Sequence, residues 1–379
     1  MMTRGSFRPA WLLLGWLLPA WAGCGGAGEP PCEIVGCDGA RLCQKADDPG
    51  ARGSWPVGAR TVLLDGRLRT EVWYPARFGS QEGRDRRVYD VRDELPLEER
   101  LKIPNDANPW MPCDCFADLP IDDRHGPYPL LVFLHGTASF RMQNLVHATL
   151  WASRGFVVAA ADYPGLMLAD VLYLQGSADL PADTRRLLGL LRDPQGDLSF
   201  LAGVVDSSRI GMAGHSAGGM ALEGFGGDPG VRVLVPMAAE GAAPGAALES
   251  VLVIGAMDDK VVPYARQVSG YESSPAKKRL IGLSNAGHLA PTDLCALRNS
   301  QGQDLVQVAK EYQITNASLA ELLWDGCAPG QLDPERGAAI VGAATTAVFE
   351  EALQCRPAGT FLSKIRDAFP EVGEYREEL

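Results

Sequence analysis

The chain has 379 residues, of which 46% are hydrophobic and 22% are charged. This usage is ordinary for a globular protein and excludes disorder over most of the chain. The formal net charge is −12 and no long basic run occurs, which excludes nucleic acid as the main partner, because phosphate binding requires a positive patch. A chain of this length can bury a large core.

The first 23 residues are expected to be a secretory signal peptide. Two arginines precede a short apolar run over 10–18, which is shorter than the roughly 20 residues that a membrane-spanning helix needs. Two cleavage sites compete. One is an ordinary signal-peptidase motif that ends at Ala22, and the other resembles a bacterial lipobox and would place a lipid on Cys24. Both predict export, either as a secreted protein or as a lipoprotein that a lipidated Cys24 tethers to a membrane of the cell envelope.

Cysteine usage also favours export. The chain has nine cysteines, and if Cys24 carries a lipid, an even number remains for disulfide bonds in an oxidising compartment. Cys295 and Cys327 flank a stretch that reads as helical, and we expect these two to pair. Cys113 and Cys115 lack the two-residue gap of common zinc sites, so no metal is expected.

The chain divides into four parts by composition. Residues 24–55 are rich in Gly, Pro and Cys and are expected to form a tether or a small stapled cap. Residues 56–370 are expected to form one domain, and residues 371–379 an acidic tail. Within the domain, residues 79–128 are charged and proline-rich, which indicates an insertion at the surface. Asp65-Gly66 between two apolar runs predicts a β-hairpin near the start of the domain.

From residue 130 onward, short apolar runs alternate with helical stretches. Continuous apolar runs are typical of strands that are covered on both faces, and their alternation with helices indicates a parallel sheet. With the hairpin, this predicts an α/β fold with a mixed, mostly parallel doubly wound sheet, followed by a helical C-terminal region that includes residues 336–353. The apolar runs are Leu130–Leu134, Phe156–Ala161, Ile210–Ala213, Val231–Met237, Val251–Gly255 and Leu280–Leu283.

The third apolar run leads directly into a candidate nucleophile. Residues 214–218 read Gly-His-Ser-Ala-Gly, the G-x-S-x-G pattern, here with a strand before it and helix-like sequence after it. The two glycines allow a turn so sharp that Ser216 stands exposed at the tip of the strand. Strand, turn and helix together make this a much stronger signal than the five residues alone.

A serine becomes an effective nucleophile only when a base removes its proton. In folds with this turn, the acid and then the histidine follow the serine along the chain. Asp258 and Asp259 both follow the fifth apolar run, and Glu240 is the next candidate acid. His288 follows the sixth run and is the one histidine after these carboxylates. Histidine suits the role of base because its pKa lies near neutral pH.

When a serine attacks a carbonyl group, the negative charge that develops on the oxygen needs two backbone N–H donors. One is expected from Ala217, the residue after the nucleophile, and the other from Thr137, in the loop after the first apolar run. His135 and His215 lie beside these residues in the sequence, and we expect both to point into the scaffold.

Three segments carry a family resemblance. Residues 129–141, 151–162 and 214–218 together resemble the α/β-hydrolase superfamily, and within it the platelet-activating-factor acetylhydrolase and dienelactone-hydrolase-like serine esterases. The resemblance implies a Ser-acid-His triad with Asp259, rather than Asp258, as the acid. It also implies a carboxylic ester as substrate and no metal or organic cofactor. The residues implied are Ser216, Asp259 and His288, with Thr137 and Ala217 as oxyanion donors.

The prediction is therefore an exported serine carboxylesterase that acts through an acyl-enzyme on neutral esters with small acyl groups. Two alternatives stay open: a polyester or cutinase-like hydrolase, and a non-catalytic binding lipoprotein on a hydrolase scaffold. The loop 238–241 lacks the tryptophan that polyester-cleaving relatives carry there. Residues 166–174 form an apolar stretch that predicts either a lid over the site or an ordinary packed helix.

Overall fold

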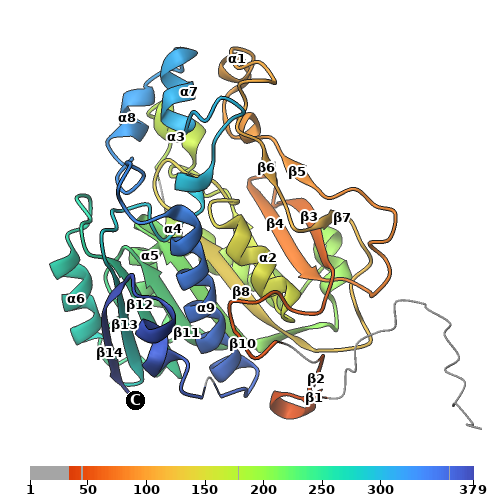
Figure 1. Cartoon of the computed structure of the whole chain (residues 1–379). Helices are drawn as coiled ribbons and strands as arrows, with labels where there is room; N and C mark the ends of the chain where they lie inside the picture. Colours follow the sequence, from red (N-terminus) through yellow and green to blue (C-terminus); the bar gives the residue numbers. More distant parts are fainter. Residues whose placement is uncertain (1–33, 44–45, 178, 358) are drawn as a thin grey trace, which may run out of the picture.

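The structure, a computed structural model, describes residues 34–43, 46–177, 179–357 and 359–379. A ten-stranded mixed sheet runs through it, with helices on both faces (Figure 1). The strand order is β14-β13-β12-β11-β10-β8-β9-β4-β3-β7. The predicted signal peptide and Cys24 lie outside the described residues.

Six neighbouring strands of this sheet run parallel to one another, and each coincides with one of the predicted apolar runs, with Phe156 alone falling just outside its strand. The predicted hairpin, β3 and β4, joins them through antiparallel pairing of β4 with β9. The predicted fold class is thereby confirmed. The six parallel strands are β8 (Tyr128–Leu134), β9 (Val157–Ala161), β10 (Val205–His215), β11 (Val231–Met237), β12 (Ser250–Ala256) and β13 (Lys278–Leu283). The other strands of this sheet are β3 (Val57–Leu64), β4 (Leu68–Pro75), β7 (Phe116–Ala117) and β14 (Val372–Glu378).

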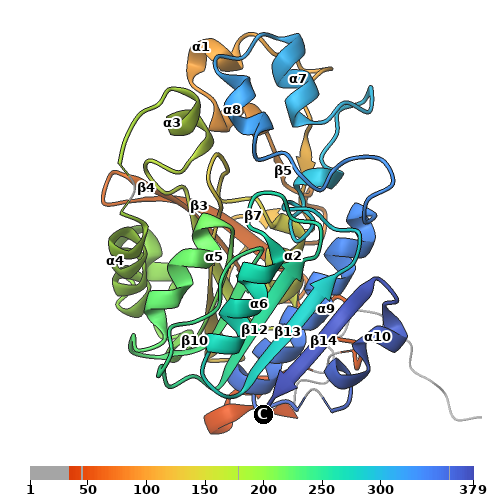
Figure 2. The same cartoon turned by 90° about the vertical axis from the view of Figure 1, so that its left-hand side faces the viewer.

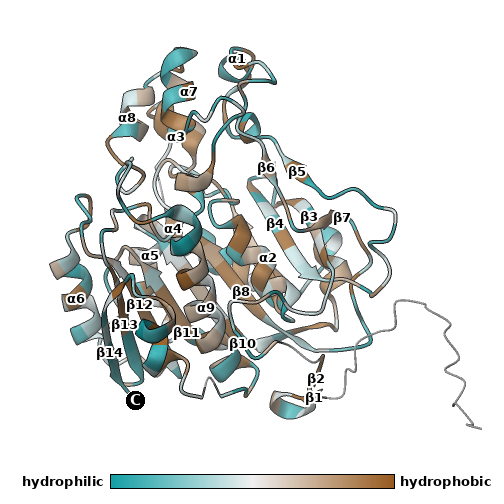
Figure 3. Ribbon diagram, in the orientation of Figure 1, coloured by the Kyte–Doolittle hydropathy of each residue, from teal (hydrophilic) through white to brown (hydrophobic). Residues whose placement is uncertain are grey.

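Each face of the sheet builds its own hydrophobic core. Successive side chains of a strand point to opposite faces, so Leu131 and Phe133 of β8 join one core, and Leu130 and Val132 join the other. The first core is covered by α2 (Leu145–Ser153) and α9 (Pro334–Leu353). The second is covered by α4 (Leu180–Arg192), α5 (Ala217–Ala221) and α6 (Tyr264–Ser273). Figure 3 shows the hydrophobic colouring of β8 and α2 against the hydrophilic edge strand β14.

Four short helices gather at one end of the molecule, beyond the sheet (Figures 1 and 2). They are α1 (Leu97–Arg100), α3 (Leu168–Leu172), α7 (Leu305–Glu311) and α8 (Ala317–Glu321). They come from three distant parts of the chain, residues 91–110, 166–174 and 294–326, which we call the cap.

The buried carboxylate of Glu99 joins the three parts of the cap. It accepts hydrogen bonds from the Thr315 hydroxyl at 2.6 Å and the Tyr173 hydroxyl at 3.1 Å, and Lys102 Nζ lies 2.8 Å away. Burial opposes the charge of Glu99, but these hydrogen bonds outweigh it and lower the pKa to about 2. The cap is therefore held together by polar contacts as well as by its own apolar cluster.

Two boundaries expected from the sequence are wrong. Residues 79–128 are not confined to the surface. Tyr89 and Cys113 lie in the first hydrophobic core, and residues 91–110 form part of the cap. Residues 371–379 are not a tail: β14 pairs antiparallel with β13, with Lys278 opposite Glu378. An edge strand has one side free of pairing, so it can carry charged residues that resemble a tail in the sequence.

The described part of the expected tether is packed against the domain. Trp55 is fully buried, and its Nε1 donates a hydrogen bond to Asp122 Oδ2 at 2.7 Å. The Arg154 guanidinium donates to the carbonyl oxygens of Ala46, Asp48 and Ala51. The tether expectation is therefore wrong for residues 46–55.

Three disulfides connect described residues. Cys295 and Cys327 are bonded, with their Cα atoms 4.9 Å apart. Cys37 is bonded to Cys355, and Cys113 to Cys115. Across the described ranges, no helix has both the length and the apolar character needed to cross a membrane.

The remaining elements are short. The strands are β1 (Ile34–Val35), β2 (Arg41–Leu42), β5 (Val88–Tyr89) and β6 (Met111–Pro112), and the α-helix is α10 (Ile365–Ala368). The 3₁₀ helices are η1 (Cys37–Gly39), η2 (Val91–Glu94), η3 (Gly196–Leu201), η4 (Leu222–Phe225), η5 (Leu294–Ala296) and η6 (Leu362–Lys364).

Candidate active site

Ser216 occupies a strained turn between β10 and α5. Its backbone has φ 53° and ψ −120°, a conformation that costs energy for any residue with a side chain. The flanking glycines make the turn possible. A Cβ atom on Gly218 would lie 2.2 Å from the Leu134 carbonyl oxygen, and one on Gly214 would lie 2.6 Å from the backbone of Gly218. The turn therefore requires this Gly-x-Ser-x-Gly sequence and presents Ser216 at the end of the strand.

His288 and Asp259 are hydrogen-bonded to each other. His288 Nδ1 lies 2.9 Å from Asp259 Oδ2, and both residues are buried. Asp259 Oδ1 accepts hydrogen bonds from the backbone N–H groups of Val261 and Val262, both at 2.8 Å. These bonds fix the orientation of the carboxylate. Asp258, one residue earlier, is exposed.

Three parallel strands bring these residues to one edge of the sheet. Ser216 follows β10, Asp259 lies three residues beyond β12, and His288 lies five residues beyond β13. Parallel strands end at the same edge, so separations of tens of residues in the sequence become short distances. Ser216 and His288 line the same pocket. Glu240, the other candidate acid, is ion-paired with Arg266 beside a separate surface pocket.

The side chain of Gln267 holds the Asp259 carboxylate in place, a contact that sequence reasoning missed. Its Nε2 donates to Asp259 Oδ2 at 3.0 Å, and its Oε1 accepts from the Ala256 N–H at 3.1 Å. The position of Gln267 in the first turn and a half of a helix after the acid loop carries no recognisable motif.

Thr137 lines the same pocket as Ser216. A Cβ atom on the preceding Gly136 would lie 3.2 Å from Ser216 Cβ, so the loop after β8 passes close to the serine. Within the described residues the Thr137 N–H has no hydrogen-bond acceptor. The Ala217 N–H is the first of helix α5, and the first N–H groups of a helix have no partner within it. Both donors are therefore available to a ligand.

A chain of three hydrogen bonds connects this loop to His288 through Gln143 and His215. The Gly136 N–H donates to Gln143 Oε1 at 2.9 Å, Gln143 Nε2 lies 3.0 Å from His215 Nδ1, and His215 Nε2 lies 2.8 Å from the His288 carbonyl oxygen. A carbonyl only accepts, so Nε2 of His215 carries the proton and Nδ1 accepts from the amide. Burial, together with the charge of His288, lowers the pKa of His215 to about 3. His215 is therefore neutral and positions its neighbours.

His135 is also part of the scaffold. Its Nδ1 lies 2.8 Å from the Gly136 carbonyl oxygen, and its Nε2 accepts from the Tyr163 N–H at 3.1 Å. Burial lowers the pKa of this imidazole. With both ring nitrogens bonded inside the fold, His135 orients the loop that carries Thr137.

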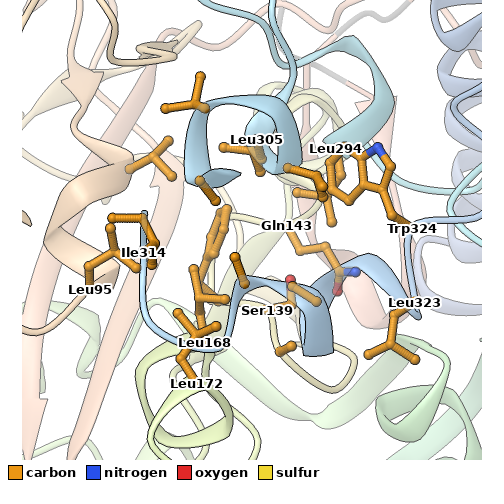
Figure 4. A pocket seen from close by; sticks show the side chains of 18 of the residues that line it. Leu95, Ser139, Gln143, Leu168, Leu172, Leu294, Leu305, Ile314, Leu323 and Trp324 are labelled. Atoms are coloured by element: carbon orange, nitrogen blue, oxygen red, sulfur yellow. The ribbon is translucent and has the colours of Figure 1, made fainter. Parts of the chain in front are cut away.

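The pocket above Ser216 has a volume of about 960 Å³, including the open space at its mouth. Figure 4 shows side chains from all three parts of the cap, among them Leu95, Leu168 and Ile314, surrounding one space. Ser216, His288 and Thr137 also line this pocket. The described residues contain no group of His, Cys, Asp and Glu side chains arranged to hold a metal ion.

Comparison with known proteins gives a structural relative. No protein-family model matches the chain, and no curated protein matches it. A solved structure that does match is a ferulic acid esterase from Streptomyces cinnamoneus, with a TM-score of 0.58 and 22% sequence identity. The match covers 83% of this chain and 94% of that one. At this identity, the likeness establishes that the two proteins share the α/β fold.

Proposed function

We propose that the protein is an exported serine hydrolase that cleaves carboxylic esters. The observation that carries the proposal is the Asp259–His288 hydrogen bond of 2.9 Å beside a serine in a strained strand-to-helix turn. In a catalytic triad, a buried carboxylate is hydrogen-bonded to Nδ1 of the imidazole. It orients the ring so that Nε2 can accept the proton of the serine hydroxyl. The solved relative is itself named as an esterase, which is compatible with this chemistry.

In the proposed mechanism, Ser216 Oγ attacks the ester carbonyl and His288 Nε2 accepts its proton. Asp259 holds the imidazole through Nδ1 and stabilises the positive charge that forms on the ring. The N–H groups of Thr137 and Ala217 donate to the oxyanion of the tetrahedral intermediate. The protonated His288 then gives its proton to the leaving alcohol. Water, activated by the same imidazole, releases the acid from Ser216.

Export is supported by the disulfides. Three bonds among the described residues are typical of a protein that folds in an oxidising compartment. A lipid on Cys24 would add a tether at the membrane surface. The test is the mass of the mature protein from its native host. Cys24→Ser should remove the lipid mass if Cys24 is acylated, and should change the mass only by the exchange of sulfur for oxygen if cleavage follows Ala22.

The hydrolase proposal is tested with Ser216→Ala and the exposed control Ser363→Ala. On a chromogenic acetate ester, Ser216→Ala should lower kcat by about 10⁴-fold or more, because the members of a triad act as a unit. Ser363→Ala should leave kcat within about twofold of wild type. An organophosphate should label the peptide that contains Ser216 and no other. If Ser216→Ala retains more than about a tenth of the activity, the proposal is wrong.

A further inference from the structure

Apolar side chains of the cap cover Ser216. Ser216 is only 8% exposed, although it stands at the tip of its strand. All three parts of the cap contribute to the roof, and Figure 4 shows their side chains directed into one space. The apolar residues include Leu95, Leu168, Leu172, Leu305, Ile314 and Leu323. A small acyl group such as acetyl would leave most of this lining without contact.

The polar groups in the lining are mostly neutral. Among its residues, Arg92 carries the one permanent charge, and its guanidinium is already bonded. Nε and Nη2 donate to the Asp90 carboxylate at 2.9 and 2.6 Å, and Nη1 donates to the Ile103 carbonyl oxygen at 2.8 Å. Three buried polar atoms of the lining have no partner among the described residues, and all three are neutral: the Ser139 hydroxyl, Asn108 Oδ1 and Trp324 Nε1. An anionic substrate group would therefore lose its water without gaining a counter-charge.

We propose that the substrate is an ester with a large, uncharged, apolar group on one side of the scissile bond, which the cap encloses. The inference rests on the proposed function. The segments that carry the family resemblance do not include the cap, so the small acyl group expected from sequence is inferred without it. That expectation stands if the enclosed group belongs to the alcohol and fails if it belongs to the acid. An enclosed pocket also suits a discrete molecule better than a polymer chain, which needs an open groove.

The measurement is kcat/KM on matched esters. One series holds the alcohol constant and varies the acid from acetate to butyrate, hexanoate and octanoate; a second holds acetate constant and varies the alcohol over the same lengths. One series should rise by about fourfold for each methylene that leaves water, and at least tenfold overall. The series that rises identifies the side that the cap encloses. The monoester of adipic acid, which has a terminal carboxylate, should react at least 20-fold more slowly than the hexanoate ester.

Two adjacent leucines of the cap provide a matched pair of variants. Leu323 lines the pocket, whereas Leu322 is 76% exposed. Leu323→Trp should lower kcat/KM for the preferred long ester at least tenfold and leave the acetate of the shortest alcohol within about threefold. Leu322→Trp should change neither. Ile314→Ala enlarges the pocket at another position in the same part of the cap and should shift the optimum by two or more carbons.

The outcomes separate this inference from the proposed function. If every ester is inert, the hydrolase proposal fails as well. If the shortest ester is cleaved and both series stay flat or fall with length, the hydrolase proposal stands and the inference about the substrate is wrong. Equal loss on long and short esters in Leu323→Trp, with an unchanged melting temperature, also overturns it.

Discussion

The Asp325 carboxylate accepts a hydrogen bond from the backbone N–H of His288 at 3.0 Å. The same oxygen accepts from the Lys260 N–H, also at 3.0 Å, and the Asp325 carbonyl oxygen accepts from the Leu289 N–H at 2.7 Å. Lys260 follows the candidate acid directly, and Leu289 follows the candidate base. One residue of the cap is thus bonded to both loops on which the proposed proton transfer depends.

Asp325 is therefore expected to act as a positioning residue. Asp325→Ala removes the acceptor for two backbone donors and should lower kcat by roughly 10- to 100-fold, since a misplacement of about 1 Å can cost that much. Asp325→Asn keeps an acceptor oxygen in the same place and should recover most of the activity. The readout is kcat with the melting temperature of each variant. Loss of stability with unchanged kcat, or failure of Asn to rescue, would contradict the prediction.

The neighbouring carboxylates Asp258 and Asp259 differ in their surroundings, so their substitution should differ in effect. Asp259→Asn should lower kcat by orders of magnitude, because an amide cannot stabilise the imidazolium as a carboxylate does. Asp258→Asn should leave kcat within about twofold, because this side chain is exposed and has no contact with His288 in the described part of the chain. Measurement of kcat for both variants decides the assignment, and the reverse ranking would transfer the role to Asp258.

The sequence predicts the central fold because its signals are local. An apolar run such as Val251–Gly255 is a strand wherever both faces of a sheet are covered, and the run into Gly214-His215-Ser216 fixes a strand, a turn and a helix within a few residues. Once the strands are parallel, their shared edge brings the loop that carries His288 to the one that carries Asp259, where the hydrogen bond forms. The parallel topology therefore explains why these two residues are close together, which their spacing in the sequence does not show.

The cap could not be predicted because its signals are not local. Glu99, Tyr173 and Thr315 are joined by hydrogen bonds across more than 200 residues of chain, and none of the three belongs to a motif. A charged stretch such as 79–128 is interpreted as solvent-exposed when the residues that pair with its charges in the fold are not known. The same holds for β14, whose Arg376 and Glu378 read as surface charge although the strand completes the sheet. For residues 166–174 the sequence predicts either a lid or a packed helix. They contain α3, a short packed helix whose side chains also line the pocket.

The Cys295–Cys327 bond should stabilise the fold more than the Cys113–Cys115 bond does. The first closes a loop with a sequence separation of 32 and the second one of 2. The chain-entropy estimate gives about 3–4 kcal/mol for the first and roughly half of that for the second, and it is model-dependent. Double Cys→Ser variants of each pair should differ accordingly in their free energy of unfolding in urea. Equal losses would show that strain or contacts, rather than loop closure, determine the contribution.

A buried charge cluster should make the stability of the fold depend on pH near neutrality. Glu94 of the cap lies 2.8 Å from Arg141 and 3.4 Å from Arg69, and Arg141 in turn lies 2.7 Å from Asp162. Burial, and next the nearby Asp162 carboxylate, outweigh the two arginines and raise the pKa of Glu94 to about 7 from the usual 4.5. Between these two values the folded protein keeps the proton on Glu94, whereas the unfolded chain releases it.

The folded state therefore binds more protons in this window, and the contribution of Glu94 to stability falls as the pH rises from about 5 to about 8. Glu94→Gln cannot ionise, so its free energy of unfolding should change less across the window. As the pH rises, the free energy of unfolding of the variant should therefore increase steadily relative to that of wild type. Urea unfolding at pH 5, 6, 7 and 8 measures this, with Glu82→Gln, an exposed position in the same segment, as the control that should parallel wild type. A gap between wild type and Glu94→Gln that stays constant, or that moves in the opposite direction, would mean that Arg141 holds Glu94 ionised throughout the range.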